Sequence, residues 1–190
     1  MSLKQAVEAV RRGGVVAYPT EAVYGLGCDP MDEDAVGKLL AIKGRPISKG
    51  LILIAGDFKA LAPYLQAVEP EIARRAFATW PGPVTWLWPA SPKVPLWLRG
   101  AHDTLAVRVT AHPLAALLCR TLDMPLVSTS ANPGGAPPAR CASEVRAYFG
   151  TSLDGVLEGE VGDLSGPTPI LDLRTGKALR PGAGKKRACN

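Results

Sequence analysis

The stretch YPTEAVYGL at residues 18–26 decides how the chain begins to fold. The apolar run at residues 15–18 predicts a buried strand, which Pro19 stops because proline cannot donate to a sheet ladder. The polar, glycine-containing residues 20–27 predict a loop. Open α/β sheets place ligands beside the ends of strands, so Thr20 is a candidate ligand residue. The alternative is an ordinary connection in which Thr20 only caps the turn.

Outward from this stretch, helices and strands alternate early in the chain, and strands dominate late. This order predicts an α/β (α+β) domain with one twisted, open, mixed sheet flanked by helices. Ser2, with Gln5 three residues later, predicts the cap of the first helix. Hydrophobic periodicity predicts helices over 2–12, 32–43, 57–65, 70–78, 113–120 and 143–149, and further strands over 51–54, 84–88, 104–110, 125–127, 156–157, 169–173 and 178–180.

Composition limits the class of protein. The 190 residues are 47% hydrophobic, which is too apolar for a disordered chain, and they suffice for one domain. We predict a domain over 1–182 and a flexible basic tail over 183–190. The net charge is +5, but Lys185, Lys186 and Arg187 supply three of those charges. The nearly neutral remainder argues against a surface built to coat nucleic acid.

The location follows from what the sequence lacks. The four cysteines are scattered, the first residues do not form a secretion signal, and no apolar run reaches membrane-spanning length. We therefore expect a cytoplasmic protein with reduced thiols and no membrane partner. The sequence has no close Cys/His pairs for a zinc site, and no nucleophile elbow or dinucleotide fingerprint.

A cationic loop follows the second predicted helix. Lys43, Arg45 and Lys49 lie within seven residues, between glycines that allow close backbone approach. Such a loop can converge on a polyphosphate through charge-assisted hydrogen bonds. The alternative is a solvated helix end, with Lys43 beside the negative end of the helix dipole.

Hydroxyl and amide side chains follow the predicted strand at 125–127. Ser128, Ser130 and Asn132 could hold phosphate or ribose oxygens at this strand end. A tight turn capped by Asn132 is the alternative.

The strand at 104–110 carries a charge on an otherwise uncharged face. Alternation puts Thr104 and Arg108 together on one face. A buried arginine needs an anionic partner. That partner is either a substrate carboxylate or a structural Asp or Glu.

All four tryptophans, Trp80, Trp86, Trp88 and Trp97, fall within eighteen residues. They could form a platform for stacking RNA bases. Few cations lie among them, which favours packing in the core.

Five motifs in order resemble those of one family. They are the stretch at 18–27, Lys-x-Arg-Pro with Lys-Gly-Leu-Ile-Leu-Ile, Trp-Pro-Gly-Pro-Val-Thr, Leu-Ala-Val-Arg-Val and Ser-Thr-Ser-Ala-Asn. The chain is thereby identified as a short bacterial member of the YrdC/TsaC family, from about residue 15 to residue 180. The resemblance implies a concave, basic cavity. It also implies a nucleotidyltransferase that converts L-threonine, bicarbonate or CO2, and ATP to threonylcarbamoyl-AMP and diphosphate.

The resemblance also implies roles for residues. The catalytic residues would be Lys43 and Arg45. The implied ATP-binding residues are Lys43, Arg45, Lys49, Thr104, Ser130, Asn132 and Arg180. The implied threonine-binding residues are Thr20, Arg108, Ser128 and Thr168, with Arg108 on the carboxylate. Mg²⁺ would enter with ATP, without a metal site on the protein.

The family's partners are proteins that transfer the threonylcarbamoyl group to the adenosine beside the anticodon of tRNAs reading A-starting codons. Two departures from the family pattern stand out: Ile54 replaces a histidine of longer relatives, and the segment around Thr168 reads Gly-Pro-Thr-Pro. Two alternatives remain open. One is an RNA-binding module that uses the basic tail and binds tRNA or double-stranded RNA weakly. The other is a related carbamoyl-adenylate enzyme of the kind found in hydrogenase maturation.

Overall fold

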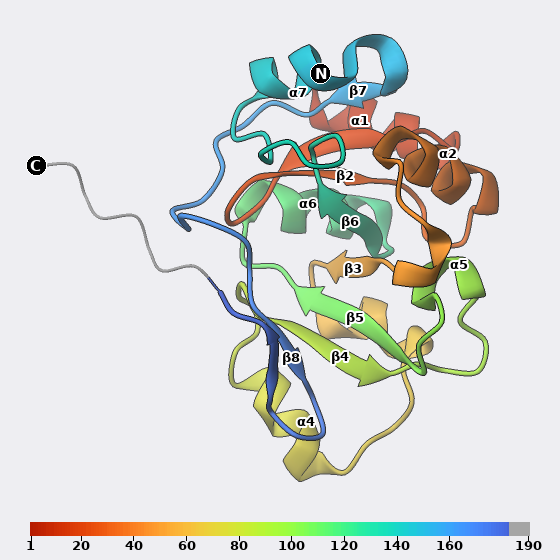
Figure 1. Ribbon diagram of the computed structural model, residues 1–190, viewed down its shortest axis with the longest axis vertical. Coiled ribbons are helices and arrows are strands. Elements are labelled where there is room, and N and C mark those ends of the chain that lie inside the picture. Colours follow the sequence, from red (N-terminus) through yellow and green to blue (C-terminus); the bar gives the residue numbers. More distant parts are fainter. Residues whose placement is uncertain (183–190) are drawn as a thin grey trace, which may run out of the picture.

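The computed structural model describes residues 1–182, and these form one mixed β-sheet with helices on both faces (Figure 1). Its nine strands run in the order β7-β1-β2-β6-β3-β5-β4-β8-β9. The strands are β1 Val16–Pro19, β2 Tyr24–Gly27, β3 Ile52–Ala55, β4 Thr85–Pro89, β5 Thr104–Val109, β6 Leu126–Ser130, β7 Gly155–Val156, β8 Ile170–Asp172 and β9 Ala178–Arg180.

The helices connect these strands. They are α1 Leu3–Arg11, α2 Glu33–Lys43, α3 Phe58–Leu61, α4 Pro70–Phe77, α5 Leu96–Arg99, α6 Pro113–Leu122 and α7 Ala142–Phe149, with short 3-10 turns η1 Ile47–Lys49, η2 Ala62–Tyr64 and η3 Gly150–Ser152. The predicted cap of α1 is confirmed, since Ser2 and Gln5 form a reciprocal capping box. No helix within residues 1–182 combines the length and the apolarity needed to cross a membrane.

The sheet contains both parallel and antiparallel strand pairs. Strands β1–β7, β3–β5 and β4–β8 pair in parallel, and the other neighbours pair antiparallel. The predicted mixed sheet in a single α/β domain is therefore confirmed. The predicted tail, with Lys185, Lys186 and Arg187, lies outside the described residues.

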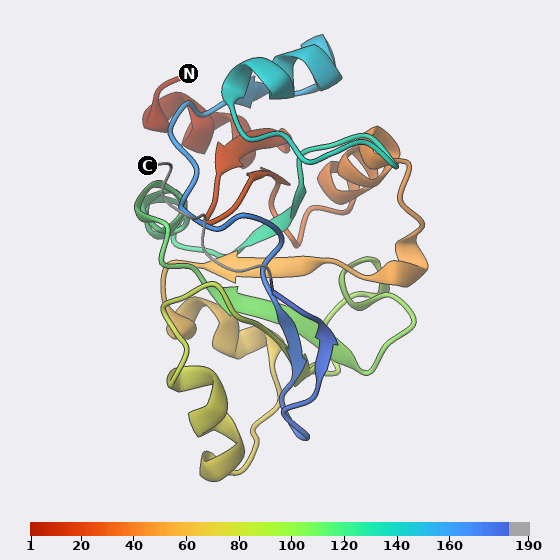
Figure 2. The same cartoon turned by 60° about the vertical axis from the view of Figure 1, so that its left-hand side comes forward.

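The two faces of the sheet carry different helices. Helices α1 and α6 pack together over β1, β3 and β6, whereas α2 belongs to the larger hydrophobic cluster on the other side (Figure 2). Along β3, Ile54 faces α6, and Ile52, two residues away, lines a cavity. Along β6, Leu126 likewise packs in the cluster with α6, and Ser128, two residues away, lines the cavity. Since side chains two apart share a face, the cavity continues the face that α6 covers.

Two expectations about the sheet are wrong. Residues 24–27, predicted as loop, form strand β2, and strand β6 runs on to Ser130 instead of ending at Val127. The two glycines made residues 24–27 read as a loop, but β2 requires one of them for close packing. A Cβ on Gly27 would lie 2.4 Å from the carbonyl oxygen of Val127 and 2.7 Å from the ring of Tyr18.

The tryptophans belong to the protein's interior. Trp86 and Trp88 are only 4% and 3% exposed and lie in the large cluster, while Trp80 and Trp97 are half-buried and pack against it. Trp80 stacks on Trp88 with ring centroids 6.3 Å apart. Packing in the core is confirmed, and a platform open to RNA bases at Trp86 and Trp88 is excluded.

Replacing Gly27 tests the close contact between β2 and β6. We expect Gly27→Ala to lower the free energy of unfolding by about 3 kcal/mol, because the added methyl group overpacks a rigid neighbourhood. The control is Gly37→Ala in α2, where a Cβ meets nothing within 4 Å. There the helix should gain roughly 0.5–1 kcal/mol. Urea unfolding of both variants measures the difference, and equal effects would contradict the packing described.

Candidate functional site

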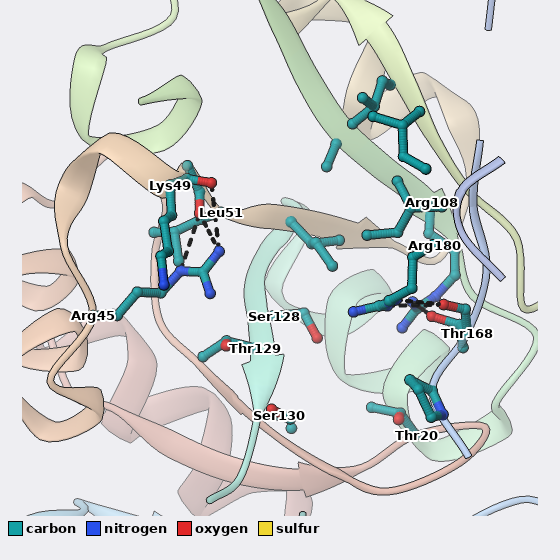
Figure 3. A pocket seen from close by; sticks show the side chains of 18 of the residues that line it. Thr20, Arg45, Lys49, Leu51, Arg108, Ser128, Thr129, Ser130, Thr168 and Arg180 are labelled. Carbon is teal, nitrogen blue, oxygen red and sulfur yellow. Dashed lines mark hydrogen bonds between the residues drawn. The ribbon is translucent and has the colours of Figure 1, made fainter. Parts of the chain in front are cut away.

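A cavity of about 550 Å³ opens on the sheet face beside α6. This volume lies within the usual range for sites that hold small molecules. Most of the predicted site residues line it (Figure 3). They are Thr20, Arg45, Lys49, Thr104, Arg108, Ser128, Ser130, Thr168 and Arg180.

Strand alternation explains how β5 and β6 contribute. On β5, Thr104, Ala106 and Arg108 face the cavity, while the residues between them are buried in the large cluster. On β6, Ser128 and Ser130 face it in the same way. Figure 3 shows these hydroxyls on the central strand, with Arg45 on one side and Arg108 on the other.

The cationic loop is closed by its own arginine. Gly44 ends α2 in the left-handed conformation, and the Arg45 guanidinium donates to the carbonyl oxygen of Gly50 from Nε and Nη2, at 3.2 and 2.8 Å. The backbone N–H of Leu51 bonds to the carbonyl of Leu98 at 2.8 Å, which fixes the loop against α5. Burial lowers the pKa of Arg45 from its ordinary value. The loop therefore presents Arg45 and Lys49 to the cavity on a defined backbone.

Of the two partners that the sequence left open for Arg108, the structure contains the structural carboxylate. Its Nη2 lies 3.4 Å from a carboxylate oxygen of Glu21, and its Nη1 donates to the hydroxyls of Thr85 and Thr168. The structural carboxylate is thus present. The Nε of Arg108, however, is buried without a hydrogen-bond partner among the described residues. A guanidinium that lines the cavity still has a donor to satisfy.

Glu21 holds its charge behind the cavity wall. Burial alone would raise the pKa of Glu21. The charge of Arg108, the hydroxyl of Thr110 and the backbone N–H of Ala111 outweigh burial, and together they lower the pKa below its ordinary value. Glu21 is not among the residues that line the cavity.

Arg180 brings a further positive charge to the cavity. Its Nε and Nη2 both donate to the carbonyl oxygen of Thr168, at 3.0 and 2.8 Å. Burial lowers the pKa of Arg180, and the neighbouring charges of Arg108 and Arg45 lower it further. Like charges gathered in one cavity repel one another unless an anion joins them.

The cavity lining, as far as the chain is described, contains no Asp or Glu side chain. Residues 1–182 also hold no cluster of three His, Cys, Asp or Glu side chains that could bind a metal ion. The residues present thus do not fit a resident Mg²⁺ ion, which prefers carboxylate oxygens. They fit an anionic ligand.

Two predicted residues, Lys43 and Asn132, are not among the side chains that line the cavity. Lys43 is 9% exposed, and its ammonium donates to the carbonyl oxygens of Ser130 and Asn132 and to Asn132 Oδ1. Burial and then the charge of Arg45 lower the pKa of Lys43 to about 8. Lys43 and Asn132 thus lie behind the cavity wall, whose lining includes their neighbours Ser130 and Arg45.

Sequence reasoning missed Arg99, His102 and Thr129, which also line the cavity. Arg99 and His102 stand on the segment around α5, which was not predicted as a helix. Only the packing of that segment against the cationic loop brings these two residues to the cavity. No local sequence pattern predicts this packing. Ile54, where longer relatives carry a histidine, is buried against α6.

Comparison with known proteins identifies the family of the chain. Residues 8–182 match the Sua5/YciO/YrdC family, described as "Telomere recombination". Proteins of Nitrosococcus oceani and Coxiella burnetii, each named threonylcarbamoyl-AMP synthase, are 57% and 53% identical to the chain. Each alignment covers 94% of the chain and 96% of the relative.

A solved structure of a Sua5 protein has the same fold as this chain. Sua5 of P. abyssi complexed with L-threonine superposes with a TM-score of 0.88 at 34% identity, over 95% of this chain. The chain spans about half the length of that Sua5 protein, 54% of it. The fold and the cavity thus define an α/β protein with an arginine-lined cavity beside its sheet. The chain belongs to the Sua5/YciO/YrdC family.

Glu21→Gln tests whether the buried ion pair with Arg108 supports the fold. We expect a loss of about 3–5 kcal/mol in the free energy of unfolding at pH 7, because Arg108 would keep a buried charge without its counter-ion. The folded-state pKa of Glu21 is lowered, so its contribution is present above about pH 4.5 and is lost as pH falls through the folded pKa. The difference in the free energy of unfolding between wild type and Glu21→Gln should therefore become smaller in acid.

Urea unfolding at several pH values measures this gap. The control is Glu71→Gln, which breaks an exposed ion pair with Arg74 and should cost at most about 0.5 kcal/mol at any pH. A gap for Glu21→Gln that stays constant from pH 7 to pH 3 would contradict the account.

Proposed function

We propose that the chain synthesises threonylcarbamoyl-AMP from L-threonine, bicarbonate or CO2, and ATP, with release of diphosphate. The observation that carries the proposal is the cavity that gathers Arg45, Lys49, Arg108 and Arg180, with no carboxylate among the described residues that line it. Close relatives named for this activity support it, as does the threonine-bound Sua5 structure of the same fold.

The reaction requires no nucleophile from the protein. The amino group of threonine adds to the carbon of CO2 and loses a proton, which gives a carbamate. A carbamate oxygen then attacks the α-phosphorus of ATP, and the bond to the β-phosphate oxygen breaks, so that diphosphate leaves. Such a step depends on positioning and on neutralising the charge of the phosphates.

Threonine binds at the Arg108 end of the cavity. Its carboxylate accepts from the guanidinium of Arg108, whose buried Nε lacks a partner. The hydroxyls of Thr20, Ser128 and Thr168 surround this position. Thr20 already donates its hydroxyl hydrogen to the carbonyl of Val23, so it offers the substrate an acceptor.

ATP binds toward the cationic loop. Arg45 and Lys49 face the phosphates from one side, and Arg180 faces them from the other (Figure 3). Thr104 and Ser130 supply hydroxyls between them. Mg²⁺ enters as part of the nucleotide substrate and is held by phosphate oxygens, because the described lining offers it no carboxylate.

The product requires an acceptor. A threonylcarbamoyl adenylate is an activated acyl group, and we propose that partner proteins transfer it to the adenosine beside the anticodon of tRNA. A contribution of Lys185, Lys186 and Arg187 to tRNA docking remains a prediction on residues outside the described range. Loss of tRNA binding without loss of adenylate synthesis after trimming residues 183–190 would separate docking from catalysis.

Arg45→Ala tests the phosphate end of the cavity. We expect it to lower threonine- and bicarbonate-dependent release of diphosphate by about 10²–10³-fold, because one cation facing the phosphates is lost. The protein should remain folded, since the guanidinium bonds only to the carbonyls of its own loop. A coupled assay of diphosphate release measures the rate, and circular dichroism checks the fold.

Lys4→Ala, on the exposed side of α1, is the matched control and should leave the rate unchanged. Undiminished diphosphate release by folded Arg45→Ala would contradict the assignment of this loop to ATP.

A further inference from the structure

Lys43 and Asn132 belong to motifs that the resemblance assigns to ATP, yet they do not line the cavity. Lys43 ends helix α2, two residues before Arg45. Asn132 follows strand β6, two residues after Ser130. Their neighbours Arg45 and Ser130 do line the cavity. The pair therefore joins the ends of two elements just behind the cavity wall.

The ammonium of Lys43 has no hydrogen left for a ligand. An ammonium group carries three hydrogens. It has three acceptors here: the carbonyl oxygens of Ser130 and Asn132, and Asn132 Oδ1 at 3.0 Å. A phosphate could gain a bond from Lys43 only if one of these carbonyls lost its partner.

The amide of Asn132 is equally occupied. Its Nδ2 donates to the carbonyl oxygens of Pro133 and Ala136, at 3.0 and 2.8 Å. Its Oδ1 accepts from Lys43 and also from the hydroxyl of Ser130, at 2.6 Å. Since Lys43 can only donate, it fixes which end of the amide faces it. The amide in turn fixes the hydroxyl of Ser130, which lies in the cavity wall.

We infer that Lys43 is a positioning residue that acts on the nucleotide through Asn132 and Ser130, and that it does not contact the phosphates. Its charge-assisted bonds join the end of α2, which carries Arg45, to the end of β6, which carries Ser130. Both sides of the ATP subsite are thereby set in one geometry. This inference rests on the proposed function and assigns a different task to one of its residues.

The substitution Lys43→Arg separates the two roles. A planar guanidinium keeps the positive charge but cannot direct three hydrogens at three oxygens that converge on one point. A positioning role predicts that Lys43→Arg and Lys43→Met both lower kcat/KM for ATP by about 10²-fold, since a small displacement of reacting groups costs that much. A phosphate contact predicts that Lys43→Arg stays within a few-fold of wild type, and that result would overturn the inference.

A double-mutant cycle gives the second readout. If Lys43 acts through Asn132, then Lys43→Met combined with Asn132→Ala should lower kcat/KM for ATP no further than the more severe single variant. Multiplicative effects for Lys43 and Asn132 would contradict the inference, and a merely structural role would change stability without this coupling in kcat/KM.

The control is Lys38→Arg on the same helix, where an exposed lysine pairs with Asp154. It should leave all kinetic constants unchanged. Each rate is divided by the fraction of the variant that is folded, which urea unfolding measures. Absence of diphosphate release by the wild-type chain would refute the proposed function itself. Release by wild type that Lys43→Arg retains would refute only the positioning role.

Discussion

The cavity depends on the way the chain neutralises Arg108. An isolated buried charge is costly, and Glu21 supplies the counter-charge from behind the wall without entering the cavity. Thr110 and the backbone of Ala111 hold the carboxylate in turn. The site can thus keep an arginine in an apolar sheet while its buried Nε stays without a hydrogen-bond partner among the described residues. The loop that begins with Thr20 and the residues that directly follow β5 are fixed to each other by the same bonds.

The second constraint is the meeting of α2, β6 and the segment around α5. Arg45 closes the cationic loop by its bonds to the carbonyl oxygen of Gly50. The carbonyl oxygen of Leu98 in α5 accepts from the backbone N–H of Leu51 at the end of the loop, and Lys43 bonds to the end of β6. The bonds of Leu98 and of Lys43 join elements that lie far apart in the sequence. Together they place cations on one side of the cavity and hydroxyls on its floor. Such a preorganised site can stabilise a charge that moves from one phosphate to the next.

Much of this could be predicted from the sequence. Hydrophobic periodicity located most helices and strands, and alternation along β5 put Thr104 and Arg108 on the cavity face. Strand β2 was missed because Tyr24–Gly27 has the composition of a loop. Gly27 is needed for contacts with Tyr18 and β6 that no local pattern reveals. Tertiary packing overrode propensity there.

The residues of the site, too, could be predicted from the sequence only in part. Motif order identified the family and nine of the residues that line the cavity, but motifs do not say which atoms face a ligand. The sequence predicted a structural Asp or Glu as one possible partner of Arg108 but did not single out Glu21. The contacts of Lys43 with Asn132 require the end of β6 to lie beside the end of α2. Arg99 and His102 reach the cavity only through that same packing of distant loops.

The central claim is that this cavity joins threonine, CO2 and the adenylyl group of ATP. Mass spectrometry of the purified chain incubated with L-threonine, bicarbonate and MgATP tests it most directly. The account predicts threonylcarbamoyl-AMP and an equal amount of diphosphate, and neither product when threonine or bicarbonate is left out. Absence of the adenylate from the complete mixture, or diphosphate formed equally well without threonine, would contradict it.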